Sequence, residues 1–272
     1  MRVTHLGNTA FNDIMKCFLE AFEGYYVKMP TDYDYYKNRW KAAKVDFELS
    51  YGMFDGNKLV GFIIHAIDQR EGGLIAFNTG TGVLPDYRGK RIVKSIYEYA
   101  IPELVKQGVT KSVLEVITAN ERAIKAYANI GFTIRKEFKC FKGEISVDDH
   151  FVNINEVDFD AVTWENILNQ DKYSWDFNSS SLKQSNARYF NVLKDGEVVS
   201  FFSMNPENNT INQMEVLMNQ SGNWEQLFSA IQSISKEVRI INVDSRLEEK
   251  LDAIKKVGLK NTVNQYEMEL AL

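Results

Sequence analysis

The stretch Val83-Leu84-Pro85-Asp86-Tyr87-Arg88-Gly89-Lys90-Arg91-Ile92-Val93 decides how the rest of the chain is interpreted. It has the pattern of a strand end, a short basic turn and the start of a helix. Ahead of it, residues 74–83 hold β-branched and aromatic residues among glycines, and Pro85 cannot donate a ladder hydrogen bond. Behind it, apolar residues return at a helical period, namely Ile92, Ile96, Ala100 and Leu104.

The basic turn predicts an anion as its partner. A helix N-terminus leaves backbone N–H groups unpaired and carries partial positive charge. Four basic residues gather at this end, namely Arg88, Lys90, Arg91 and Lys94. Because these charges work against the helix dipole, a bound anion would compensate them. Taken alone, the stretch fits a solvated basic turn more simply, so the neighbouring segments decide between the two interpretations.

Composition limits the class of protein. The chain has 272 residues, 44% hydrophobic and 25% charged, which are values of a globular protein of one large or two small domains. A net charge of −5 argues against a general nucleic-acid binder. Cys17 and Cys140 are too far apart for a disulfide framework or a metal cluster, as expected in a reducing cytoplasm. Residues 1–11 lack a signal pattern, and no run reaches membrane-spanning length, so we expect a cytoplasmic protein.

The first half alternates helical and strand patterns. We expect helices at residues 11–26 and 29–45, three antiparallel strands at 47–54, 58–67 and 74–83, a helix from Ile92 that Pro102 bends or ends, a strand at 112–118, a helix at 121–130 and a strand at 132–141. Asn120 is a good N-cap for the short helix, and Gly131 stands where a helix ends in the left-handed conformation. The aromatic residues of the second helix fit core packing better than a pocket wall, and they are Tyr33, Tyr35, Tyr36 and Trp40.

This order of elements resembles the GNAT superfamily of N-acetyltransferases. The segment Val83–Val93 looks like the family's coenzyme-A loop, Arg/Gln-x-x-Gly-x-Gly/Ala. A second segment matches the family's Asn…Ala…Tyr…Gly-Phe pattern through Asn120, Ala123, Tyr127, Gly131 and Phe132. The resemblance covers residues 1–142 and implies an α/β fold of the α+β type, with a mixed, largely antiparallel sheet flanked by helices.

The resemblance also implies a role for each matching residue. Backbone groups of Gly82 and Val83 would pair with the pantetheine arm of acetyl-CoA, as an added strand does. The side chain of Asn120 would contact the coenzyme, and Tyr127 would stand near its sulfur. The pyrophosphate would be held by N–H groups of the loop, those of Arg88, Gly89, Lys90, Arg91, Ile92 and Val93.

Two positions depart from the family pattern. The loop's two small positions are occupied by Arg91 and Val93, and a side chain there narrows the approach of the backbone to the pyrophosphate. Arg91 offers a charge-assisted contact to phosphate instead. Acetyl-CoA therefore remains the expected co-substrate, with altered affinity or another acyl-CoA as the alternative.

Acyl transfer to an amine requires a positioned neutral amine and a way to stabilise the leaving thiolate. The phenol of Tyr127 is the expected general acid. The alternative is that Tyr127 is only an aromatic residue of the core. Glu115, a single charge in an apolar strand, is a candidate base or a member of a structural ion pair. His65 is a second candidate base, more simply a structural histidine, and Cys140 has the pattern of a buried hydrophobe rather than a nucleophile. His5 and His150 look peripheral, and no metal is expected.

The second half repeats the pattern of the first. Strands at 189–193 and 197–204 around a turn mirror the first hairpin, and a helix that stops at Gly258 mirrors the one that stops at Gly131. Residues 218–222 lack the positive charge of the basic turn, and no tyrosine falls at 254–256. We therefore expect a GNAT-like domain at 1–142, a linker at 143–150, and a diverged GNAT-like domain at 151–272 that binds no coenzyme.

The sequence thus predicts an enzyme that moves an acetyl group from acetyl-CoA to a primary amine of a small molecule, an amino acid or a peptide. An alternative from another class is a non-catalytic acyl-CoA-binding or sensing protein, which would bind without turnover. A third is a structural scaffold whose basic turn binds nothing. RNA binding is disfavoured, because no aromatic–basic interleaving accompanies the loop.

Overall fold

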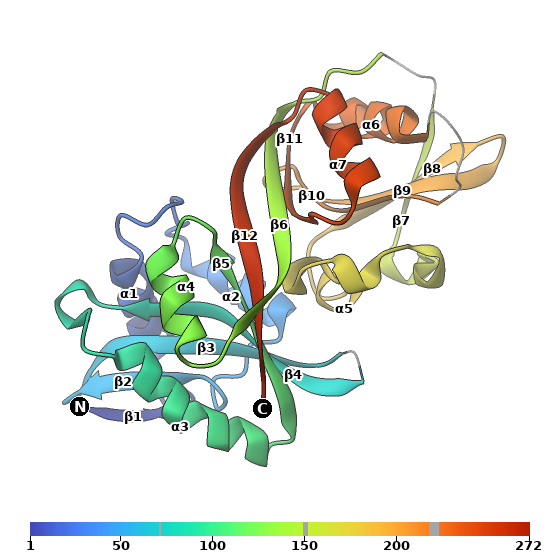
Figure 1. Ribbon diagram of the computed structural model, residues 1–272. Coiled ribbons are helices and arrows are strands. Elements are labelled where there is room, and N and C mark those ends of the chain that lie inside the picture. Colours follow the sequence, from blue (N-terminus) through green and yellow to red (C-terminus); the bar gives the residue numbers. More distant parts are fainter. Residues whose placement is uncertain (71, 149–151, 218–222) are drawn as a thin grey trace. The chain divides into compact units, whose positions relative to one another are not determined.

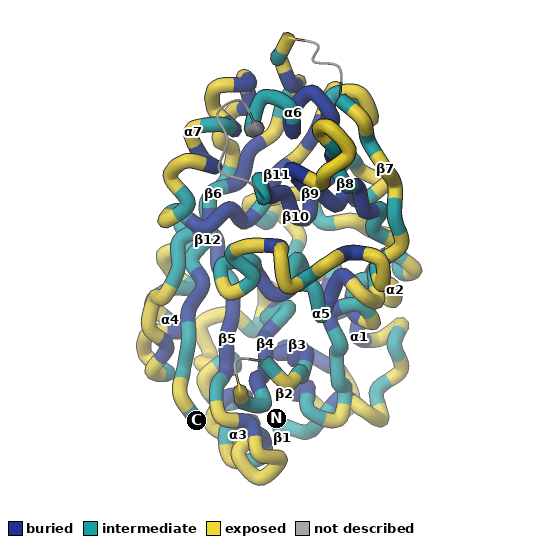
Figure 2. Tube along the Cα trace, turned by 90° about the vertical axis from the view of Figure 1, so that its right-hand side faces the viewer, coloured by how far each residue is buried: buried dark blue, intermediate teal, exposed yellow. Residues whose placement is uncertain are grey.

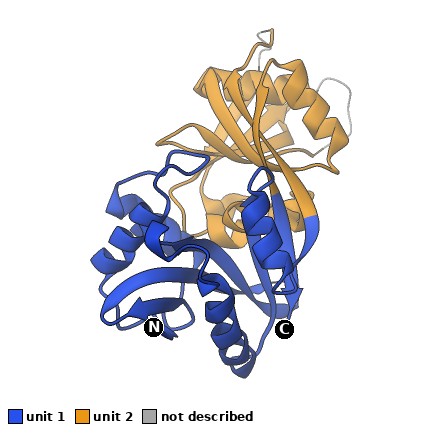
Figure 3. Cartoon of the chain, turned by 60° about the vertical axis from the view of Figure 1, so that its left-hand side comes forward, with its two compact units in different colours: residues 1–135, 266–272 blue, residues 136–265 orange. Residues whose placement is uncertain are grey.

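The computed structural model describes residues 1–70, 72–148, 152–217 and 223–272. The chain forms two compact units, shown in different colours in Figure 3. The first unit comprises Met1–Arg135 and Tyr266–Leu272, and the second comprises Lys136–Gln265. In both units the buried residues are concentrated along the strands (Figure 2).

The first unit contains these elements in chain order (Figure 1): β1 (Arg2–His5), α1 (Phe11–Ala21), α2 (Tyr33–Ala43), β2 (Tyr51–Asp55), β3 (Lys58–Arg70), β4 (Gly73–Val83), α3 (Ile92–Lys106), β5 (Val109–Ile117), α4 (Glu121–Ala128) and the start of β6 (Thr133–Glu144). β1 to β4 form an antiparallel meander, as the sequence predicts for its last three strands. β5 pairs with β4 in parallel, because the crossover helix α3 returns the chain to the same end of the sheet.

Helices α1 and α3 cover opposite faces of this sheet. A Cβ on Gly82 would meet Phe62 and Ala21 at 2.5 and 2.8 Å, so α1 lies against the face of Gly82. A Cβ on Gly61 would meet Ile92 at 2.7 Å, so α3 lies against the other face. Gly82 is therefore a glycine because of the close approach of α1.

The aromatic residues of α2 are core residues, in agreement with the simpler interpretation of the sequence. Tyr36 and Trp40 are 1% and 2% exposed, and their rings lie 4.9 and 5.6 Å from the ring of Phe18 on α1. Tyr33 and Tyr35 are partly buried and pack against the same core. Each of these contacts buries apolar area and adds an edge-on aromatic pair.

The second unit repeats the order of the first. Its elements are β7 (Asn153–Val157), α5 (Ser179–Leu182), β8 (Arg188–Lys194), β9 (Glu197–Asn205), β10 (Thr210–Val216), α6 (Asn223–Ile234), β11 (Glu237–Asp244), α7 (Glu248–Lys256) and β12 (Lys260–Ala271). β7 to β10 are antiparallel, and β11 joins β10 in parallel after the helix α6. The predicted internal repeat is therefore present in the fold.

Strands β6 and β12 each contribute to both units. The strand order places β12 between β5 and β6, and its last residues belong to the first unit. There, Met268 is 1% exposed in the core, and Glu269 forms an ion pair with Lys111 at 3.1 Å. The division of the chain thus differs from boundaries at 142 and 150: β6 continues through Glu144, and Ile145 is fully buried. Residues 149–150 of the expected linker, with His150, lie outside the described residues.

Several expected element boundaries are wrong, among them those of α1 and β2. α1 ends at Ala21 rather than at residue 26. β2 begins at Tyr51 rather than at residue 47, because the side chain of Asp46 accepts hydrogen bonds from the N–H groups of Glu48 and Leu49 and holds a turn there. Of the two effects expected of Pro102, it does not end the helix: α3 continues to Lys106, where the burial of Leu104 outweighs the missing proline donor.

Met268→Ala tests whether the chain's last segment stabilises the first unit. Since Met268 is fully packed, we expect the free energy of unfolding of that unit to fall by about 2–5 kcal/mol. Ala271→Ser, at an exposed position of the same strand, is the matched control. Denaturant unfolding of the full chain measures both; equal stabilities would show that this segment is dispensable.

Candidate active site of the first unit

In the first unit, β4 and β5 pair along part of their length and then diverge. The gap between their backbones beyond the last pair is called the crevice below. The parallel pairing runs from Leu74 opposite Val109 to Asn78 opposite Leu114. Beyond it, β4 continues to Val83 and β5 to Ile117 without a further described pair between them. The edge of β4 from Thr79 to Val83 therefore presents backbone groups that another extended chain could pair with.

A β-bulge marks the point of divergence. The antiparallel register of β3 and β4 shifts there, since Ile64 lies opposite Gly80 whereas His65 lies opposite Asn78. Thr79 is the extra residue, and its hydroxyl accepts a hydrogen bond of 2.9 Å from Arg39 on α2. The bulge changes which side chains share a face of β4.

Tyr127 of α4 lies beside this bulge in a buried group of polar side chains. Its ring lies 6.4 Å from that of Tyr97 on α3, and the side-chain amide of Asn78 donates hydrogen bonds of 2.7 Å to the hydroxyls of Tyr97 and Thr81. Burial raises the pKa of Tyr127 to about 12, and the polar side chains of Thr81 and Asn78 partly offset this rise. The phenol is therefore fully protonated at neutral pH, as an acid must be before it donates a proton.

The turn between β4 and α3 presents unpaired backbone donors. Gly89 and Arg91 have φ angles of +81° and +57°, so the chain passes twice through the left-handed region before α3 begins. No side chain caps α3, and the first helical hydrogen bond described is from the N–H of Ser95 to the carbonyl of Arg91. The N–H groups at this helix start are those that would bind an anion.

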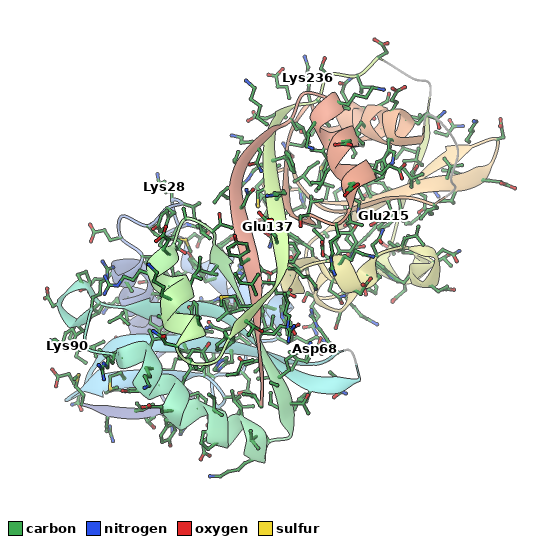
Figure 4. All side chains as sticks on the ribbon, in the orientation of Figure 1. Lys28, Asp68, Lys90, Glu137, Glu215 and Lys236 are labelled. Atoms are coloured by element: carbon green, nitrogen blue, oxygen red, sulfur yellow. The ribbon has the colours of Figure 1, made fainter. Side chains whose placement is uncertain are left out.

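The basic side chains of the turn differ in what they contact. Arg88 donates hydrogen bonds to the carbonyls of Val83 at 3.3 Å and Ala21 at 3.0 Å, so it fixes the turn to the end of α1. Lys90, which leads into α3 (Figure 4), is exposed and lies over the ring of Tyr87 at 4.6 Å. Arg91 is exposed, and Val93 packs against the core.

Asn120 is the N-cap of α4, as predicted: its side chain accepts a hydrogen bond of 3.2 Å from the N–H of Ala123. Burial raises the pKa of the nearby Tyr25 phenol, and the side chain of Asn120 partly offsets this rise. Gly131, with a φ of +116°, follows α4 as expected.

The candidate bases occupy different environments. Glu115 is half-buried on β5, one residue beyond the last β4–β5 pair. His65 is fully buried with its Nδ1 2.8 Å from the carbonyl of Leu49, and burial lowers its pKa to about 4. His65 is therefore a neutral structural residue at physiological pH. Cys140, in the second unit, is a buried thiol beside Asn242, as the simpler interpretation of the sequence expects.

The sequence did not indicate three polar residues that lie with Tyr127 in one group, namely Asn78, Thr81 and Tyr97. The only signal for them is the segment Asn78-Thr79-Gly80-Thr81-Gly82, whose glycines inside a strand are typical of a bulge. Among the described residues, no group of three or more His, Cys, Asp or Glu side chains is arranged to hold a metal ion. Nor is any described helix long and apolar enough to cross a membrane.

Comparison with known proteins identifies the class. Residues 10–132 match the model of the Acetyltransferase (GNAT) family. Over 93 residues the chain is 33% identical to the [ribosomal protein bS18]-alanine N-acetyltransferase of Escherichia coli K12. The aligned segment covers 33% of this chain and 60% of that protein. The chain thus spans less than two thirds of the length of the curated relatives it matches.

Solved structures extend the similarity to the whole chain. An acetyltransferase structure from Pyrococcus horikoshii matches with a TM-score of 0.73 and 14% identity, over 100% of this chain and 89% of the other. A tandem GNAT protein from the clavulanic acid biosynthesis pathway matches with a TM-score of 0.70 and 12% identity, over 99% of this chain and 98% of the other. The protein therefore carries a GNAT-family domain at residues 10–132 within a tandem GNAT-like fold, which confirms the family and the fold predicted from the sequence.

Arg91→Gly tests the strain in the basic turn. A non-glycine residue in the left-handed region costs roughly 1–2 kcal/mol, and the greater freedom of an unfolded glycine offsets about half of the gain. We expect the variant's free energy of unfolding to rise by about 0.5–1 kcal/mol. For Lys125→Gly, at an exposed position in the regular helix α4, it should fall by about 1 kcal/mol instead. Parallel losses in both variants would mean that Arg91 is unstrained.

Proposed function

We propose that this protein transfers an acetyl group from acetyl-CoA to a primary amine, and that the first unit does the chemistry. The observation that carries the proposal is the proximity in the fold of three features: an unpaired strand edge on β4, an uncapped helix start at α3, and the protonated phenol of Tyr127. The strand edge at Gly82 and Val83 suits the amides of the pantetheine arm. The N–H groups from Gly89 to Val93, with the exposed cations Lys90 and Arg91, suit the pyrophosphate. The N–H of Arg88, which the sequence also assigned to the pyrophosphate, instead donates to the carbonyl of Pro85 at 3.1 Å.

In the proposed reaction, the amine nitrogen bonds to the carbonyl carbon of the thioester as the carbon–sulfur bond breaks. The electron pair of that bond goes to sulfur, which takes the proton of the Tyr127 phenol. The amine loses one proton, and the phenolate regains one. Glu115, next to the last β4–β5 pair, is the proposed acceptor of the amine's proton, directly or through water.

The second unit also has two parallel strands that pair and then diverge, but its own side chains fill the space between them. β10 and β11 are paired only at Thr210 opposite Arg239 and Ile211 opposite Ile240, and Asn212 is the bulged residue. Beyond the bulge, the phenol oxygen of Tyr173 accepts the N–H of Met214 at 3.2 Å and lies 3.1 Å from its carbonyl. Tyr173 thus occupies the strand edge that corresponds to the one left open on β4.

A buried ion pair beside Tyr173 fills the rest of the space between these strands. Lys250 lies three residues after the N-cap of α7, as Ala123 lies three residues after the N-cap of α4, and it forms an ion pair with Glu215 of β10. Figure 4 labels Glu215. The side chains of Lys250 and Glu215 are 5% and 3% exposed, and both contact the Tyr173 hydroxyl. The cavity that remains is about 20 Å³, enough for one water molecule. These contacts support a single coenzyme per chain; the segment 218–222, expected to lack the basic turn, lies outside the described residues.

Calorimetric titration of the full chain with acetyl-CoA tests the proposal. We expect one molecule bound per chain, and weaker binding after Gly89→Ala, which forces a Cβ onto a residue with a φ of +81°. Gly56→Ala is the matched control, because Gly56 also has a positive φ with open space around it but lies in the β2–β3 turn. Absence of binding excludes the enzyme, and two molecules per chain exclude a closed second unit.

Tyr127→Phe tests the acid. The variant keeps the ring packing but loses the proton, so we expect kcat for thiol release to fall about 10²-fold or more while the affinity for acetyl-CoA stays near wild type. The acceptors to screen are amino acids, polyamines and peptides with a free N-terminus, including alanine peptides, since the E. coli relative is named for an alanine acceptor. Binding without turnover for every amine would favour the acyl-CoA-binding alternative.

A further inference from the structure

The side chain of Asn78 forms hydrogen bonds across the β-bulge of β4. Asn78 is 5% exposed, and its side-chain carbonyl oxygen accepts the N–H of Gly80 at 3.1 Å. Its amide nitrogen donates to the hydroxyl of Thr81 at 2.7 Å. Because the oxygen meets an N–H donor and the nitrogen meets a hydroxyl, the orientation of the amide is fixed. The extra residue of the bulge, Thr79, lies between Asn78 and these two partners in the sequence.

The bulge makes these contacts possible. Residues three apart in a regular strand point to opposite faces of the sheet, so Asn78 would not reach Thr81. With one extra residue between them, the register places Asn78 opposite His65. It places Thr81 opposite Ile63, two positions earlier on β3 and therefore on the same face. The bond between Asn78 and Thr81 thus exists only while the bulge is present, and in turn it stabilises the bulge.

The same amide joins the bulge to helix α3. Its nitrogen also donates to the hydroxyl of Tyr97 at 2.7 Å, and Tyr97 is fully buried. Tyr97 lies in the second turn of α3, which begins at Ile92. On the other side, Asn78 and Leu114 form the last described pair between β4 and β5. Asn78 therefore connects the point where the crevice begins with the helix whose start presents unpaired N–H groups.

The strand edge and the helix start are proposed to hold two parts of one coenzyme molecule. The edge of β4 beyond Asn78 suits the pantetheine arm, and the N–H groups at the start of α3 suit the pyrophosphate. Because the two parts of the ligand are covalently joined, both can bind only if the two elements of the protein lie at a matching spacing. A side chain that fixes this spacing in advance raises the affinity for the whole molecule.

We infer that Asn78 is a positioning residue for coenzyme binding: its side chain holds the β-bulge and ties it to Tyr97, so that the strand edge at residues 79–83 keeps a fixed spacing from the start of α3. The inference rests on the proposed function, since it concerns the two parts of acetyl-CoA. It assigns Asn78 no contact with the ligand, because its side-chain groups are bonded to Gly80, Thr81 and Tyr97.

Calorimetric titration of Asn78→Ala with two ligands tests the inference. The ligands are acetyl-CoA and 3′-phosphoadenosine 5′-diphosphate, which is the coenzyme without its pantetheine arm. We expect the Kd of acetyl-CoA to rise about tenfold, because the strand edge is no longer held, while the Kd of the nucleotide stays within about twofold of wild type. An equal rise for both ligands, or an unchanged Kd of acetyl-CoA, would overturn the inference.

Two further variants separate positioning from a general loss of structure. Tyr97→Phe keeps the buried ring but removes an acceptor of the Asn78 amide, so the Kd of acetyl-CoA should rise here too, with no further rise when it is combined with Asn78→Ala. Asn205→Ala is the matched control, because Asn205 also accepts the N–H two residues on, that of Glu207 at 2.8 Å, but in the second unit. It should leave both Kd values unchanged. Additive rises in the double variant would exclude the link from Asn78 to α3.

Hydrogen exchange of the ligand-free, ¹⁵N-labelled chain gives a readout that does not depend on the coenzyme. The N–H of Gly80 should exchange about tenfold faster in Asn78→Ala, because it loses its acceptor, whereas those of residues 74–77 should keep their rates. In Asn78→Asp a carboxylate oxygen still accepts this N–H, so Gly80 should stay protected.

The exchange rates also separate the inference from the proposed function. Unchanged exchange of Gly80 in Asn78→Ala, or faster exchange along the whole of β4, would show that Asn78 does not hold the bulge. Wild-type protein that binds no acetyl-CoA, together with faster exchange at Gly80 alone in Asn78→Ala, would reject the proposed function and leave the bond across the bulge established.

Discussion

The site depends on one constraint, which is that every backbone N–H and C=O of a sheet needs a partner. β4 and β5 satisfy it as a parallel pair up to Asn78 and Leu114, and then separate. Beyond Asn78, β4 has an edge in the middle of a sheet rather than at its border. The backbone groups of such an edge need side chains, water or an extended ligand as partners, and the uncapped start of α3 beyond the same strand adds donors of the same kind.

The two units satisfy this constraint in different ways. In the second unit, Tyr173 pairs with the backbone of Met214, and Lys250 with Glu215 occupies the space beside it. Burying two opposite charges there costs solvation that the pair and the tyrosine hydroxyl must compensate. The first unit has Ala123 where the second has Lys250. The comparison within one chain therefore supports the proposal that only the first unit binds the coenzyme.

Much of this architecture could be predicted from the sequence, because it depends on local patterns. Turn glycines, the cap at Asn120 and the apolar periods fix the order of elements, and the basic turn with Tyr127 indicates the family. The network of Asn78, Thr81 and Tyr97 could not be predicted, since it depends on one inserted residue in the pairing of β3 with β4. Two other contacts could not be predicted either, because they join residues far apart in the sequence: that of Tyr173 with β10, and that of Met268 with the core of the first unit. The alternation of residues along a strand predicts on which face of the sheet a side chain lies only where the pairing register is regular.

The return of the last strand also affects how the first unit folds. Its residues 1–135 include every proposed catalytic group, yet the strand beside β5 is completed by residues 266–272. A contact of such sequence separation forms late, because closing a long loop costs entropy before the contact gives anything back. Until then, β5 has an exposed edge on one side and the crevice on the other. The proposed active site can thus reach its final rigidity only after the second unit has been made, which links the two halves through folding even though only one is proposed to bind the coenzyme.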